Sequence, residues 1–171
     1  MSDSTAHDLA TGLRDWFDAA THEIDAPCDI DRIIVTPGRP AVEGCNEIAV
    51  WVSTIAPTAR PNIEATADGN GRCPVQTYVE LTWRLSTCTT INEDSRGPIT
   101  EAAHLADAEC FDVWLFGLYR RLAIDAGNGA LSDTSGCALQ SFGALTTEDR
   151  GGGRVSASQV LRVSVELTVP T

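Results

Sequence analysis

The chain has 171 residues, of which 43% are apolar, and it carries a formal charge of −12. This length and composition are typical of one folded domain, and no run of about 18 apolar residues predicts a membrane-spanning helix. All 12 basic residues are arginines, so a lysine-dependent phosphate-binding loop is excluded, and the net acidity disfavours a protein that reads duplex DNA. The polar, acidic N-terminus does not have the pattern of a secretory signal.

The first expected element is an amphipathic helix that ends before Pro27. Its apolar residues recur at helical spacing and form one stripe: Leu9, Leu13, Trp16, Phe17, Ala20 and Ile24. Two strands follow, at Asp29–Val35 and Glu47–Ile55, and the stretch 56–73 is then long enough to form a functional arm. The clearest alternation lies in 75–87, where one face is predicted to pack on the core and the other to meet solvent or a neighbouring molecule.

A second helix is predicted from about Thr100 to Asp125. Its core stripe consists of Leu105, Ala108, Phe111, Leu115, Leu118 and Leu122. Three aromatic residues, Trp114, Phe116 and Tyr119, widen the apolar surface of this helix beyond what one sheet face needs. We therefore expect part of the helix to meet another molecule.

The remainder of the chain is predicted to be β-structure. A weakly alternating strand at 137–147 is followed by a turn at Glu148–Arg154 and by a cleanly alternating final strand at 155–169. The predicted order is therefore α-β-β-β-α-β-β. A mostly antiparallel sheet with two helices packed on one face indicates an α+β fold, formed by a single domain that spans residues 1–171.

Six cysteines occur in the chain: Cys28, Cys45, Cys73, Cys88, Cys110 and Cys137. Neighbouring cysteines are at least 15 positions apart, so the closely spaced ligand pairs of zinc ribbons and fingers are excluded. In a chain of this length without an export signal, buried and reduced thiols are the favoured interpretation. Disulfides come next and metal binding last.

His104 and Asp107 are the strongest catalytic candidates in the sequence. Separated by three positions on one helix, they could share a metal ion or form an orienting pair. They lack a third ligand and a neighbouring nucleophile, so an exposed helix face explains them better. The sequence predicts no catalytic residue, no metal site and no cofactor.

Three segments together form a pattern. They are the opening helix Leu9–Ile24, the long strand Val75–Thr87 with the helix Ala102–Ile124 after it, and the closing unit Leu139–Leu167. In this order they resemble the tail terminator proteins of long-tailed bacteriophages. The resemblance implies a structural virion protein, assembled in the host cytoplasm, that forms a hexameric ring at the head-proximal end of the tail. Such a ring caps the tail tube, stops its polymerisation and joins the tail to the head connector.

The resemblance also implies the partners. These are other copies of the chain, the major tail tube protein and the head-tail connector or stopper protein, with the tape-measure protein as a further candidate. Genomic DNA would pass through the lumen without sequence-specific binding, and a ring of such acidic chains would repel its phosphates.

A closed head-to-tail ring needs two different complementary patches on each subunit. We expect one on the flank of the second helix and the other on an exposed strand edge or on the 56–73 arm. The candidate interface residues are Trp114, Phe116, Tyr119, Arg60, Asp68, Arg72, Arg150 and Arg154.

Three other functions remain open on the sequence. One is another connector or neck subunit, such as a stopper or a head-completion protein, although two strong helices count against a stopper. The second is a small α+β enzyme that uses His104 and Asp107. The third is a ligand-binding module with a pocket between the sheet and its helices, which a monomeric particle in sedimentation would favour.

Overall fold

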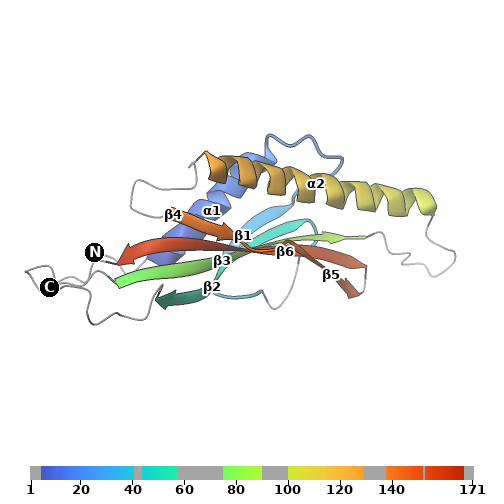
Figure 1. Ribbon diagram of the computed structural model, residues 1–171. Coiled ribbons are helices and arrows are strands. Elements are labelled where there is room, and N and C mark those ends of the chain that lie inside the picture. Colours follow the sequence, from blue (N-terminus) through green and yellow to red (C-terminus); the bar gives the residue numbers. More distant parts are fainter. Residues whose placement is uncertain are drawn as a thin grey trace, which may run out of the picture.

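Two helices cover one face of a six-stranded sheet (Figure 1). The computed structural model describes residues 5–40, 44–57, 75–89, 100–128, 138–151 and 153–167. The helices are α1 (Thr5–Thr21) and α2 (Glu101–Gly127). The strands are β1 (Arg32–Thr36), β2 (Glu47–Pro57), β3 (Val75–Cys88), β4 (Ala138–Phe142), β5 (Thr146–Gly151) and β6 (Arg154–Leu167). This mixed, mostly antiparallel sheet confirms the predicted α+β fold class.

The strands lie in the order β1-β2-β3-β6-β4, and β5 pairs with β6 further along the same edge as β4. All pairings are antiparallel except that of β1 with β2, which is parallel. The long strands β3 and β6 pair over their full lengths, from Val75 opposite Leu167 to Cys88 opposite Arg154. They form the centre of the sheet.

The hydrophobic core lies between the sheet and the helices. Trp83 of β3 is completely buried, packs on Phe17 of α1 with ring centroids 5.1 Å apart, and donates its indole N–H to the Gln159 side chain of β6. From α2, Leu118 and Leu122 reach the same cluster. The predicted stripe of the first helix is confirmed, because its members are buried in this core or packed against it. Aromatic and aliphatic burial of this extent is the main stabilising contribution to the fold.

Because β1 and β2 are parallel, the segment between them must run back along the sheet. We call residues 37–46 the return segment. Its described residues, 37–40 and 44–46, lie on the face of the sheet without helices. Arg39 lies 3.7 Å from the Glu148 carboxylate on β5. A Cβ atom at Gly44 would lie 2.7 Å from the Glu47 carboxylate. Both glutamates project from this face, which we call the helix-free face, because their register partners include Ser86 and Ser156 rather than core residues. The return segment therefore covers part of that face.

The core stripe predicted for the second helix is correct only in its later turns. Phe111, Leu115, Leu118 and Leu122 are buried, whereas Leu105 is 63% exposed and Ala108 is also exposed. The first turns of α2 extend beyond the ends of the strands (Figure 1). Periodicity alone cannot show where the surface beneath a helix ends.

The C-terminal part contains three strands instead of the two predicted. The turn predicted at Glu148–Arg154 is too long, because Thr146–Gly151 forms β5 and pairs with β6 as far as Arg154, so that the turn lies between Gly151 and Arg154. Thr146 and Thr147 are exposed on this edge strand, so no apolar alternation indicated it. The proposed arm at 56–73 begins later than predicted, since β2 continues to Pro57, and 58–74 lies outside the described residues.

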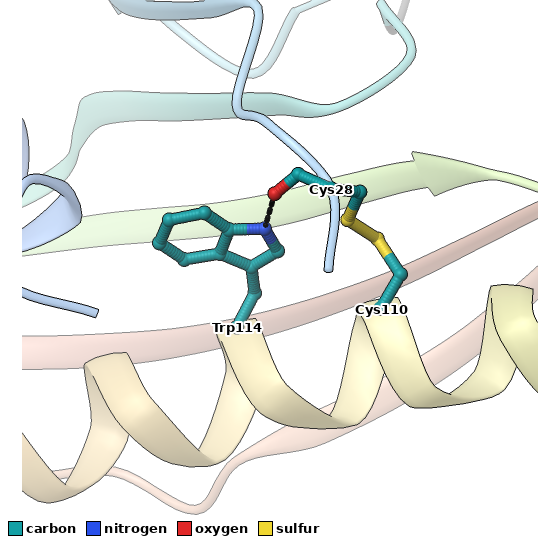
Figure 2. Close-up of a disulfide and its surroundings, with 3 residues drawn as sticks. All are labelled: Cys28, Cys110 and Trp114. Carbon is teal, nitrogen blue, oxygen red and sulfur yellow. Dashed lines mark hydrogen bonds between the residues drawn. A yellow bond between two sulfur atoms is a disulfide. The ribbon is translucent and has the colours of Figure 1, made fainter. Parts of the chain in front are cut away.

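Two disulfides correct the interpretation of the cysteines as reduced thiols. Cys28 is bonded to Cys110 of α2, and Cys45 is bonded to Cys88 at the end of β3 (Figure 2 shows the first). The bonds join residues 82 and 43 positions apart, so each fixes a connecting segment to a regular element. Cys73 and Cys137 lie outside the described residues.

Candidate assembly surfaces

The outward side of α2 carries large apolar residues in contact with water. Leu105, Phe116 and Tyr119 are 63%, 62% and 40% exposed. Their spacings of 11 and 3 positions place them on one side of the helix. We call these three residues the α2 ridge. Two exposed acidic residues, Glu109 and Asp112, lie on the same side between Leu105 and Phe116, so the apolar residues of the ridge are separated by negative charge.

Trp114 belongs to the opposite side of α2. It is only 4% exposed, and its indole N–H donates to the carbonyl oxygen of Cys28 at 2.9 Å (Figure 2). Trp114 and Phe116 are two positions apart, which is more than half a helical turn, so one points into the core and the other away from it. Of the three aromatic residues expected at an interface, only Phe116 and Tyr119 are therefore available at the surface of the chain.

Polar contacts fix the two helices to each other near the C-terminal end of α2. Arg121 forms ion pairs with Glu23 and with Asp125, the second at 2.8 Å. Asp125 also accepts a hydrogen bond from the Trp16 indole at 2.9 Å. The hydrogen bond from Arg121, followed by the one from Trp16, lowers the pKa of Asp125. These contacts hold α1 and α2 as one layer, so the α2 ridge is a fixed surface.

The helix-free face contains a row of polar residues that crosses the sheet. Five strands each contribute one residue to this row, and each residue is the register partner of the next. From one edge of the sheet to the other, the row consists of Arg32, Glu47, Ser86, Ser156 and Glu148. Glu47 is 1% exposed and pairs with Arg32, whose side chain is half exposed. The row begins with a cation at β1 and ends with an anion at β5.

Much of the helix-free face is buried within the chain. Thr82, Arg84 and Ser86 of β3 are 7%, 2% and 1% exposed, which corrects the expectation that this side of the strand meets solvent or a neighbour. The Arg84 guanidinium lies 5.5 Å from the centroid of the Trp51 ring, a cation–π arrangement. The alternation of β3 was predicted correctly, but the burial of the polar residues on its second face was not.

Nearer the other end of β3, an ion pair is partly exposed. Arg162 of β6 donates to the Glu80 carboxylate at 2.6 Å, and its guanidinium lies 4.3 Å from the centroid of the Tyr78 ring. The hydrogen bond from Arg162, followed by one from Thr54, lowers the pKa of Glu80. The group fixes β2, β3 and β6 side by side.

The sheet has two open edges within the described part of the chain, where β1 pairs only with β2 and β5 only with β6. Four consecutive residues of β1, Ile33 to Thr36, are uncharged and half-buried, and their pairing has no register shift. The opposite edge is irregular, with register shifts between Leu139 and Ser141 and between Asp149 and Gly151. The two edges are therefore different surfaces.

The remaining candidate residues are spread over the molecule. Arg60, Asp68 and Arg72 lie outside the described residues; Arg150 is in β5, and Arg154 is half-buried at the start of β6. Sequence reasoning missed Leu105, Arg32 and Glu148. The last two could have been found only from the strand register.

His104 and Asp107 lie on the first turns of α2, with His104 exposed. Across the residues that the structure describes, no three His, Cys, Asp or Glu side chains are grouped as a metal site would require. No helix in that same part is long and apolar enough to span a membrane.

No protein-family model matches the chain, and no curated protein matches its sequence.

Proposed function

We propose that the chain is a structural subunit of a phage tail terminator ring. The observation that carries the proposal is the presence of different surfaces on one firmly fixed body: the two unequal open edges of the sheet, with the exposed α2 ridge as a separate surface for another partner. A closed ring of identical subunits is built by heterologous contacts, which require two such surfaces on each copy. The element order of the tail terminator proteins, which this chain resembles, supports the same conclusion.

The ring, hexameric by that resemblance, stands at the head-proximal end of the tail. One side contacts the tail tube protein and ends its polymerisation, and the other contacts the head-tail connector. The charge of −12 on each chain supports passage of DNA, because a negative lumen repels phosphates and does not retain the duplex.

The test has two parts. Purified full-length protein is examined by sedimentation and negative-stain electron microscopy, where we expect closed rings. Virions that lack the protein should then have tails of uncontrolled length that are not joined to heads. Rings together with tails of normal length would instead indicate a different neck subunit, and a stable monomer under all conditions would contradict the proposal.

A further inference from the structure

After Arg32, the β1 edge lacks most of the features that normally keep a strand edge from pairing. Soluble proteins protect open edges with charges, prolines, bulges or very short strands. From Ile33 to Thr36, β1 carries none of the first three, and its pairing with β2 is regular. In the described part of the chain no other strand lies on its outer side. This edge has the properties of a surface that accepts another strand.

The β5 edge complements the β1 edge in direction and length. The strands β1, β2 and β6 run in one direction, and β3 and β5 run in the opposite direction. If a second copy continues the sheet in the same orientation, β5 of the second copy lies beside β1 of the first and runs antiparallel to it. Antiparallel pairing is slightly more stable than parallel pairing. The strands contain 5 and 6 residues.

The charges at the two edges are also complementary. Arg32 and Glu148 stand at opposite ends of the same polar row on the helix-free face. When the row continues from one copy to the next, Arg32 of one copy lies beside Glu148 of its neighbour. Opposite charges directly across an antiparallel pair are stabilising. On the next residues, Ile33 and Ile34 then meet Thr147 and Thr146, which carry no charge.

We propose that the β1 edge of one copy pairs antiparallel with the β5 edge of the next, with Arg32 opposite Glu148, so that the ring is closed by one continuous sheet. This inference rests on the proposed ring. Five strands lie abreast in each copy. Six copies with strands about 4.8 Å apart give a circumference of about 145 Å and a backbone diameter of about 46 Å.

The bore is widest when the helix-free face lies towards the axis, because the helix layer, about 10 Å thick, then lies outside the closed sheet. The helices, with the α2 ridge, lie on the outside of the closed sheet, where they remain available to other virion proteins.

A photo-crosslinking experiment tests the pairing directly. The probe p-benzoylphenylalanine is placed at Ile34 in the full-length protein, with a second sample carrying it at Leu105 on the α2 ridge. Isotope-labelled and unlabelled copies are mixed, irradiated and analysed by mass spectrometry. We expect the Ile34 probe to link to a peptide of another copy that contains residues 146–148. Intact rings with links elsewhere, or with none, would overturn the edge pairing and leave the ring. Absence of any ring would overturn both proposals.

A matched pair of charge variants gives an independent test. Glu148→Arg places a cation beside Arg32 of the neighbour, and we expect at least a tenfold loss of ring at fixed protein concentration. Glu109→Arg makes the same change of net charge on the exposed side of α2 and should leave assembly unchanged, as should Arg39→Ala, which removes the ion pair within the chain that Glu148→Arg also breaks. Circular dichroism checks that both variants fold. Equal losses in the two variants, or no loss with Glu148→Arg, would exclude the proposed pairing.

Discussion

The helix-covered face of the sheet and much of the helix-free face are buried, but by different means. The helix-covered face is closed by apolar side chains of α1 and α2 around Trp83. On the helix-free face, polar and charged residues such as Glu47 and Arg84 are buried, and the return segment with the Cys45–Cys88 disulfide lies against it. The helix-covered face contains the hydrophobic core that stabilises the single chain. The second face keeps polar and charged residues even where they are buried.

The largest effect is expected from breaking the helix-covered face. Trp83→Ala removes a fully buried indole and leaves the Gln159 side chain without its donor, so we expect a loss of about 3–5 kcal/mol in the free energy of unfolding. Trp51→Ala is the matched variant on the helix-free face and should cost less, because Trp51 lies outside the hydrophobic cluster. Urea unfolding measures both. Equal losses would mean that the two faces contribute alike.

A smaller effect is expected from releasing the return segment. Replacing Cys45 and Cys88 together by Ser removes a bond between residues 43 positions apart, and we expect a loss of about 2–4 kcal/mol. Hydrogen exchange should rise in residues 44–47 and remain slow in α1. The control is the paired Ser variant of Cys28 and Cys110, which should loosen residues 22–31 instead. Faster exchange at the same residues in both variants would show that the disulfides do not act on separate faces.

The sequence predicted the parts of the molecule that follow from local periodicity. The stripe of α1 and the alternation of β3 were sufficient because their neighbours repeat at fixed spacing. The disulfides join residues far apart in the chain, and the sequence contains no signal for such pairing. The strand β5 is exposed at an edge, so it has no apolar alternation to detect.

The candidate surfaces were predicted less well for the same reason. Phe116 and Tyr119 were expected at an interface and are exposed, but Trp114 was grouped with them although it lies on the buried side of α2. A helical wheel anchored on Leu118 would have separated them. The opposite charges of Arg32 and Glu148 become meaningful only through the register of five strands, which no local pattern contains.

The smallest effect is expected in the pH dependence of stability, which compares one carboxylate on the helix-free face with one in the helix layer. Hydrogen bonds lower the pKa of Glu80 on the helix-free face and of Asp125 in the helix layer, so each carboxylate stabilises the folded state at pH values above its unfolded pKa. This contribution is lost as the pH falls through the folded-state pKa. Glu80→Gln and Asp125→Asn should therefore each lower stability at pH 7 and flatten its decline in acid.

The measurement is the free energy of unfolding between pH 7 and pH 3 for both single variants and the double variant. Because the two carboxylates share no partner and lie on opposite sides of the sheet, their effects should add. Additivity would show that the ion pairs of the helix-free face stabilise that face independently of the helix layer. A double variant no less stable than either single variant would mean that both pairs belong to one coupled network, and the distinction between the two faces would fail.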